Sequence, residues 1–240
     1  MNSEIYRLLG SPEPGGLLIV SDHASNRIPA GIDLGIPAHL LDEHVAIDIG
    51  VAGVAERMVR PGTAAFLCQF SRLVCDVNRD EHAPTVCPIA SDGHAIPGNA
   101  LDHAGREARL DRFFRPYHAA LADVLDTVRP GLVLSLHSFT PQLASRPDEA
   151  RPWHIGILYN HDDAPARIAI PLLEAQGLCV GDQLPYSGVL LNATMNHHCE
   201  GRHPYLGVEV RQDLIADAAG QEEWAERLAA LCRSILGAQG

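Results

Sequence analysis

The sequence is short of positive charge. Its 240 residues carry 18 Lys and Arg against 30 Asp and Glu, which gives a formal net charge of −12 with histidine neutral. Binding to nucleic acid regardless of base sequence needs Lys and Arg to neutralise phosphates, and attachment to an anionic membrane surface needs a basic patch. We therefore expect neither nucleic acid nor a membrane among the partners of this chain.

Long hydrophobic runs and paired cysteine motifs are also missing. Every apolar run falls short of the roughly 18 residues that a membrane-crossing helix requires. The opening segment MNSEIYRLLGSPEPGG lacks the basic start and apolar stretch of a secretory signal peptide. Six cysteines are present, but no two have the C-x-x-C spacing of a zinc ribbon or a thioredoxin-like site. These features predict a cytoplasmic protein.

Apolar runs typical of strands alternate with segments of helical periodicity. We expect a long loop over 78–99 and another over 179–188. The predicted strands cover 17–21, 64–69, 72–77, 132–136, 154–159 and 205–214, and the predicted helices cover 41–59, 102–128 (with Pro116 as a possible kink), 164–176 and 221–236. This alternation favours one domain over 1–240, with a largely parallel sheet and helices on both of its faces.

Histidine is plentiful, at 13 residues, and two histidines follow apolar strands directly. His23 comes after 17–21 and His137 after 132–136, so both are expected at the carboxyl ends of strands, where open α/β sheets carry their chemistry. Asp48 lies on the apolar face of the predicted helix. Two imidazoles and one carboxylate are a standard set for catalytic Zn²⁺, with a fourth position open for water. Alternatively, His23 caps the next segment and Asp48 faces solvent.

Glu209 interrupts the apolar run LGVEVR. A carboxylate is costly to bury there unless it is paired or functional, so Glu209 is a candidate general base. The plainer interpretation is an ion pair with Arg211 on a half-exposed strand. Arg72, Asn78 and Arg79 cluster around RLVCDVNR, and arginine can bind a substrate carboxylate through two parallel hydrogen bonds, although surface salt bridges are equally compatible.

Eight blocks in order along the chain resemble the N-formylglutamate amidohydrolase family. The blocks are SDHASNRIP (21–29), HVAIDIGVAGVAERM (44–58), SRLVCDVNRD (71–80), YHAAL (117–121), SLHSFTP (135–141), RPWHIGILY (151–159), LPYSG (184–188) and GVEVRQDLI (207–215). The resemblance implies a zinc-exopeptidase-like fold, a three-layer α/β/α sandwich around a mixed, mostly parallel sheet. It also implies a small-molecule N-acyl amino acid as substrate and Zn²⁺ or another divalent metal as cofactor.

Matched residue by residue, the resemblance assigns roles within the candidate site. It makes His23, Asp48 and His137 the metal ligands and Glu209 the catalytic residue. The acidic ligand stays open, because the related carboxypeptidase pattern would place it at Asn26, which supplies no anionic oxygen, and His44 is a further alternative.

The remaining assignments concern the surroundings of the metal and the substrate. Asn26, His44 and His198 are candidates for a supporting layer around the ligands. Binding of the substrate carboxylate is expected from Arg72, Asn78, Arg79 and Arg211.

The block around His23 departs from the best-defined branch of the family. It reads DHASN, whereas the members that fit histidine breakdown carry a block closer to P-H-x-G-T. The leading expectation is hydrolysis of N-formyl-L-glutamate to formate and glutamate. The alternatives are an amidase for peptidoglycan fragments or other peptides, and a silent ligand-binding member of the family.

Overall fold

A seven-stranded sheet runs through the centre of the protein. The computed structural model describes residues 4–238. The strand order is β1-β3-β2-β6-β9-β7-β8, and only the pairs β1/β3 and β7/β9 are antiparallel. The prediction of a mixed, mostly parallel sheet is thereby confirmed. The strands are β1 (Tyr6–Leu9), β2 (Leu17–Ser21), β3 (Thr63–Cys68), β6 (Leu132–Phe139), β7 (Ile155–Leu158), β8 (Val180–Asp182) and β9 (Tyr205–Arg211).

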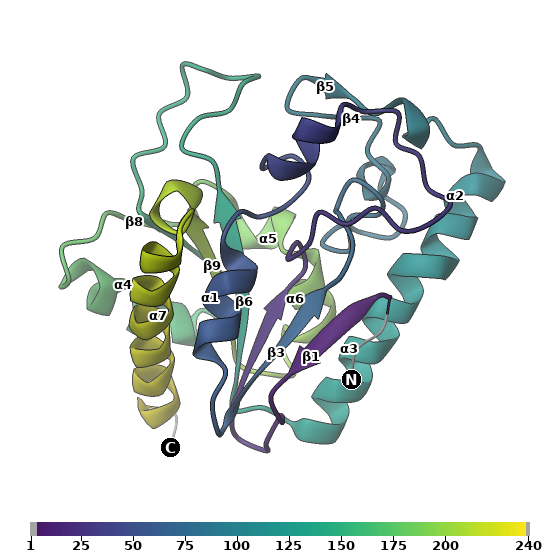
Figure 1. Ribbon diagram of the computed structural model, residues 1–240. Helices are drawn as coiled ribbons and strands as arrows, with labels where there is room; N and C mark the ends of the chain where they lie inside the picture. Colours follow the sequence, from purple (N-terminus) through teal and green to yellow (C-terminus); the bar gives the residue numbers. More distant parts are fainter. Residues whose placement is uncertain (1–3, 239–240) are drawn as a thin grey trace.

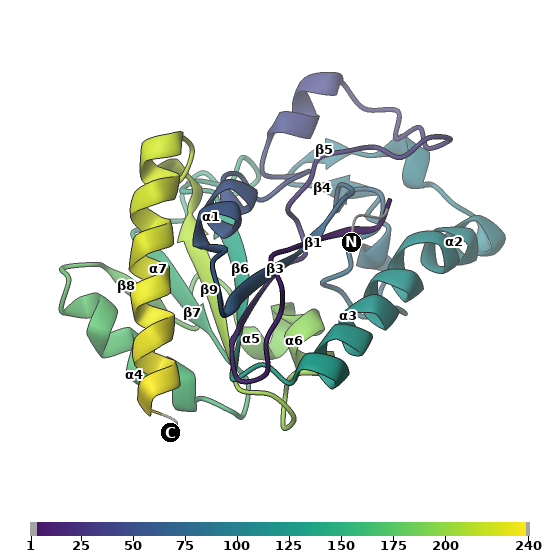
Figure 2. The ribbon, with the colours of Figure 1, turned by 60° about the horizontal axis from the view of Figure 1, so that its bottom comes forward.

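Helices cover both faces of the sheet, which makes the three layers of an α/β/α sandwich (Figures 1 and 2). One face carries α1 (Val51–Met58), α4 (Ala164–Glu174) and α7 (Ala218–Ala238). The other carries α2 (His103–Arg109), a π-helical turn (Leu110–Phe114), α3 (Arg115–Val128) and α6 (Ala193–His198). A short helix, α5 (Gly188–Leu191), precedes α6. Within residues 4–238, no helix is long and apolar enough to cross a membrane.

The central strands are apolar on both faces because both faces are covered. Along β2, Leu17 and Ile19 pack toward α1 and α7, whereas Leu18 and Val20 pack toward α3. Side chains alternate across a strand, so a continuous apolar run supplies two cores at once. Where such a strand ends, the next residue lies at the rim of the sheet and can be polar.

The predicted helix over 41–59 is wrong in its first half, since α1 begins only at Val51. Gly50 precedes it with φ of 86°, a left-handed conformation that interrupts a right-handed helix. Glycine is needed there, because an added Cβ would lie 2.1 Å from the carbonyl oxygen of Ile215. The apolar spacing arises instead from a turn that packs against the sheet.

The predicted strand over 72–77 is also wrong. The segment is a buried loop whose backbone bonds are local or reach another loop: Val74 N donates to Ser71 O at 2.9 Å, and Asp76 N donates to Val86 O at 2.7 Å. Burial of an apolar run therefore did not require a strand here. Conversely, β8 lies in the segment where only a loop was expected.

The segment 78–99 contains little regular structure, as expected for a long loop. It has two three-residue 3₁₀ turns and a short hairpin, β4 (Ala90–Ser91) with β5 (His94–Ala95). The long helix expected over 102–128 is present, with its π-helical turn directly before the segment that contains Pro116. Proline lacks the backbone N–H that a regular helix would use at this point.

Candidate active site

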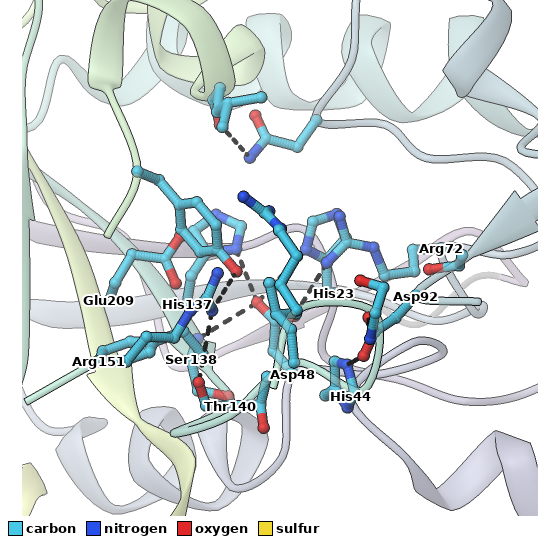
Figure 3. Close-up of a pocket in the computed structure, with 18 of the residues that line it drawn as sticks. His23, His44, Asp48, Arg72, Asp92, His137, Ser138, Thr140, Arg151 and Glu209 are labelled. Atoms are coloured by element: carbon cyan, nitrogen blue, oxygen red, sulfur yellow. Dashed lines mark hydrogen bonds and ion pairs between the residues drawn. The ribbon is translucent and has the colours of Figure 1, made fainter. Parts of the chain in front are cut away.

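A cavity of about 300 Å³ opens at the carboxyl ends of β2, β6 and β9 (Figure 3). The parallel pairs β2/β6 and β6/β9 bring these strand ends to one edge of the sheet. Loops complete the wall. The lining residues include His23, His44, Asp48, Arg72, Asn78, Arg79, Asp92, His137, Thr140, Arg146, Arg151, Tyr186, Leu191 and Glu209.

Strand register places two of the candidate residues side by side. His137 of β6 and Glu209 of β9 are direct partners across the parallel pair. On the other side of β6, Val20 of β2 pairs with Ser135, so continuing the same register by two residues brings Asp22 beside His137. Residues opposite each other on paired strands point to the same face of the sheet. The register of the three strands therefore places His137 between the carboxylates of Asp22 and Glu209.

His23, Asp48 and His137 form a compact group in which one ligand atom from each lies within 4.8 Å of the others. The Asp48 Oδ2 atom lies 2.8 Å from His137 Nδ1 and 3.3 Å from His23 Nδ1. All three side chains are buried. In Figure 3, Asp48 stands between the two imidazole rings.

The far nitrogen of each ring faces a second carboxylate. His23 Nε2 lies 2.7 Å from Asp76 Oδ1, and His137 Nε2 lies 3.4 Å from Asp22 Oδ2. Burial opposes ionisation of both aspartates, but the neighbouring charges, with Arg72 foremost beside Asp76, hold the pKa of each carboxyl below its usual value. Ionised carboxylates only accept hydrogen bonds, so His23 Nε2, which is hydrogen-bonded to Asp76, carries hydrogen. His137 Nε2 and Asp22 Oδ2 form an ion-pair contact without a hydrogen bond, and the negative charge of Asp22 favours hydrogen on that nitrogen as well.

In this arrangement, three hydrogen-bond acceptor atoms from His23, His137 and Asp48 face one another. With hydrogen on both Nε2 atoms, a neutral His23 and a neutral His137 each present a bare Nδ1 lone pair toward Asp48 Oδ2, which is itself an acceptor. Three such atoms repel one another unless a cation lies among them. The residues therefore fit a divalent metal, and histidine ligands oriented by carboxylates are usual at such sites.

Without a metal ion, a proton is the cation that relieves the convergence. Although burial favours the neutral ring, the contacts with Asp22 and Asp48 raise the pKa of His137 well above its ordinary value. Burial also opposes the charge on Asp48, but the nearby His23 and His137 lower the pKa of its carboxyl. Both pKa shifts have the same origin: the negative carboxylates and a positive charge on the imidazoles stabilise each other.

Asp48 lies between turns rather than in a helix, and hydrogen bonds to His23, Ser138 and Arg72 hold it in place. Asp48 N donates to His23 O at 3.0 Å, and Ser138 N donates to Asp48 Oδ2 at 3.3 Å. Arg72 donates to Asp48 Oδ1 at 3.3 Å and to Asp76 Oδ2 at 2.8 Å, so it joins two carboxylates of the site. The sequence placed Arg72 among substrate-binding residues, whereas its guanidinium is engaged with the carboxylates around the rings.

Glu209 is buried in the wall of the cavity beside this group. Burial, followed by the negative charge of Asp48, raises the pKa of Glu209 to about 7. A carboxyl group with a pKa near neutrality can both take up and release a proton during turnover.

The structure brings some of the other predicted residues to the cavity. Asn78 and Arg79 line it, and so does His44, whose Nε2 lies 3.0 Å from Asp92 Oδ2. His44 is thus paired with a carboxylate at the rim. The compact group contains Asp48 rather than His44.

Three predicted residues lie outside the cavity lining. Asn26 Nδ2 donates to Asp42 Oδ1 at 3.0 Å. Arg211 is drawn away by its ion pair with Asp213 at 2.8 Å. His198 packs behind the site, with its Nε2 2.9 Å from His118 Nδ1.

Arg151 was not singled out from the sequence, although it belongs to the block RPWHIGILY. Its side chain is only 1% exposed, and it lies between Thr140 O, Tyr186 and Glu149. Tyr186 Oη lies 3.1 Å from its Nη1. Among residues 4–238, Arg151 Nη2 has no hydrogen-bond partner, so it can bind an anion in the cavity.

Comparisons with known proteins identify the family and the fold of this chain. A sequence model of the family described as N-formylglutamate amidohydrolase matches residues 15–216. No curated protein matches the chain. The crystal structure of a gene product from Agrobacterium tumefaciens is 30% identical, with a TM-score of 0.90 over 98% of this chain and 96% of that chain. An N-formylglutamate amidohydrolase from Ralstonia eutropha JMP134 has the same fold, with 20% identity and a TM-score of 0.73 over 98% of each chain.

Proposed function

The chain belongs to the N-formylglutamate amidohydrolase family and is an amide-hydrolysing enzyme, and from this premise we propose that it hydrolyses N-acyl amino acids with the help of a divalent metal, most readily Zn²⁺. N-formyl-L-glutamate is the first substrate to test. The convergence of His23 Nδ1, His137 Nδ1 and Asp48 Oδ2 carries this proposal, because three acceptors at one point call for a cation.

His23, Asp48 and His137 would hold the metal. Bound there, a divalent ion supplies a Lewis acid that polarises a carbonyl group and makes water more acidic. Asp76 and Asp22 orient the two rings, so that both Nδ1 atoms face the same point.

Glu209 moves the proton. As a carboxylate it accepts a proton from the hydrolytic water, and as an acid it delivers that proton to the leaving nitrogen. Its position opposite His137 across β6 and β9 sets it next to the ligand group, and its pKa of about 7 suits both half-steps.

Arginine side chains supply the binding energy for an acidic substrate. Arg151 presents its Nη2 from a buried position, and Arg79 lines the cavity directly after Asn78. A guanidinium binds a carboxylate through charge-assisted hydrogen bonds, which are roughly twice as strong as neutral ones. The anion expected at these residues is a carboxylate of the amino-acid moiety.

One feature favours an acyl group or peptide larger than formyl. Leu191 lines the cavity, and the adjoining Val189 and Leu190 are 52% and 79% exposed. These apolar side chains beside a polar cavity would cover a bulky apolar part of a substrate. This observation keeps a peptide or N-acyl amidase with a larger substrate as the second candidate.

Two measurements on the purified protein test the proposal. Metal analysis should find about one divalent ion per chain. A panel of N-formyl-, N-acetyl- and longer N-acyl-L-glutamates together with muropeptides should then show turnover that a chelator abolishes and Zn²⁺ restores. Turnover that survives complete metal removal would contradict metal dependence. Metal-loaded protein without turnover of any member would leave the silent ligand-binding alternative.

A further inference from the structure

Two neighbouring residues of α3, Tyr117 and His118, reach the back of the active site. They belong to the block YHAAL. Tyr117 is fully buried and His118 is half-buried. Successive side chains on a helix are about 100° apart, so adjacent residues contact different parts of the neighbouring structure. Here the two parts are the two halves of the active site.

Tyr117 acts on the half that would hold the metal. Its hydroxyl donates to Asp22 Oδ1 at 2.6 Å, and Asp22 Oδ2 faces His137 Nε2 at 3.4 Å. Burial, reinforced by Asp22, raises the pKa of Tyr117, so the hydroxyl remains a donor. The tyrosine thereby fixes the rotation of Asp22, which in turn orients the ring of His137.

His118 acts on the half that would bind the substrate. Its Nε2 lies 3.0 Å from Val77 O, and a carbonyl only accepts, so this nitrogen carries the hydrogen. Val77 directly precedes Asn78 and Arg79. The same carbonyl also accepts from Thr194 Oγ1 at 3.3 Å, and Thr194 N donates to Asn78 Oδ1 at 3.0 Å. The backbone before Arg79 is therefore held from two helices.

His198 completes the second arm. Its Nε2 lies 2.9 Å from His118 Nδ1, which is the bare nitrogen of that ring. Burial lowers the pKa of His198 to about 3, so the ring is neutral and donates through Nε2. His198 thus fixes the ring of His118 rather than contacting the metal ligands.

We propose that Tyr117 and His118 are positioning residues with separate tasks: Tyr117 sets the metal ligand His137 through Asp22, and His118 sets Asn78 and Arg79 through Val77. This inference rests on the proposed function. It predicts that the two neighbours give different defects when substituted. If the two residues served only to stabilise α3, substituting either one would give the same defect.

The first arm is tested by the zinc affinity of the metal-free protein, measured by chelator competition. Tyr117→Phe removes only the hydroxyl and should weaken zinc binding about 3- to 10-fold, less than the 10- to 100-fold typical of a direct partner of a ligand. Tyr205→Phe is the matched control, because Tyr205 is equally buried and its hydroxyl also donates to a carboxylate, Glu200 Oε2 at 2.9 Å. The control should keep the affinity of the wild type.

The second arm is tested by the KM of the substrate that turns over best. His118→Leu should raise KM about 3- to 10-fold with kcat changed less than twofold and zinc affinity unchanged, and His118→Gln, which retains an N–H donor, should recover part of the loss. His154→Leu is the control, since His154 accepts a hydrogen bond from Cys179 N at 2.8 Å and lies outside the cavity lining.

The outcomes separate this inference from the proposed function. Wild-type protein that binds no zinc contradicts the proposed function itself. Zinc binding that is equal in the wild type and Tyr117→Phe, or weakened as much in Tyr205→Phe, overturns the first arm. If no substrate turns over, amide hydrogen exchange of 77–80 replaces KM. Faster exchange in His118→Leu but not in Tyr117→Phe supports the second arm, and equal exchange overturns it.

Discussion

The cavity has two halves that are built in different ways. His23 follows β2, and His137 and Glu209 lie in the carboxyl-terminal halves of the neighbouring β6 and β9, with exposed fractions of 2%, 4% and 7%. Arg79, Arg146 and Arg151 come from loops, and their side chains are 25%, 63% and 1% exposed, so burial in this half is uneven. The strand half takes its geometry from the sheet, whereas the loop half takes it from local contacts. Under the proposed function, the sheet therefore places the residues of the reaction, and the loops place those that bind the substrate.

The largest effect is expected in the strand half, from Glu209→Gln. The amide keeps the shape of the side chain but cannot accept the proton of water, so kcat should fall by about 10²- to 10⁴-fold. Metal content should remain at the wild-type level, because Glu209 is outside the ligand group. Steady-state kinetics and metal analysis of the same preparation check this. A variant with normal kcat would show that another group moves the proton.

A smaller effect is expected in the loop half, from Arg151→Met. Loss of the charge-assisted bonds to an acidic substrate should raise KM by about 10- to 100-fold and change kcat much less. Arg151→Lys should recover little, since an ammonium group lacks the planar fork. Arg146→Met is the matched control, because Arg146 also lines the cavity but is largely exposed. Equal KM values in the two methionine variants would remove Arg151 from substrate binding.

The burial of Glu209 should also appear in the stability of the metal-free protein. Its pKa rises from 4.5 to about 7 on folding, so between these pH values the folded chain holds a proton that the unfolded chain has released. The free energy of unfolding therefore falls as pH rises through this window. Glu209→Gln cannot ionise and should gain on the order of 3 kcal/mol over the wild type above pH 7.

Below pH 4.5 that difference should vanish, because the wild-type carboxyl is then protonated in both states. Urea unfolding of the wild type and of Glu209→Gln at a series of pH values, with chelator present, measures it. Parallel stability curves across the whole range would mean that Glu209 is not destabilised by burial.

The smallest effect is expected at the rim, from His44→Ala. His44 pairs with Asp92 and is separate from the compact ligand group, so zinc affinity should change by less than about threefold. Asp48→Ala should instead reduce it by far more than the 10- to 100-fold typical of a supporting residue. Zinc titration of both variants decides between the two alternative ligands. A large loss in His44→Ala would reverse the assignment.

The sequence predicts the strand half well, because strand ends depend on short-range patterns. The runs before His23 and His137 were identified as strands, and the structure confirms both, although β6 continues past the predicted end, through His137 to Phe139. The alternation of strands and helices was sufficient for the layered fold. Roles for these residues stay predictions, as does the single domain over 1–240.

What the sequence could not predict depends on contacts between distant segments. Asp48 was assigned to a helix because its neighbours have helical spacing, but Gly50 interrupts that helix against Ile215. Asp22 and Asp76 are ordinary aspartates until the fold turns them toward the two rings. Arg151 is one of many arginines, and only its burial beside Tyr186 distinguishes it. No local pattern encodes such pairings.

The register of β6 and β9 also limits how the length of this chain can change. Deleting a single residue ahead of Glu209 within β9 would turn its side chain to the opposite face of the sheet, away from His137. Insertions in the loops over 78–99 or 140–154 would leave that pairing intact. Related chains should therefore differ in length between the strands, and alignments that open a gap inside β6 or β9 should be redrawn.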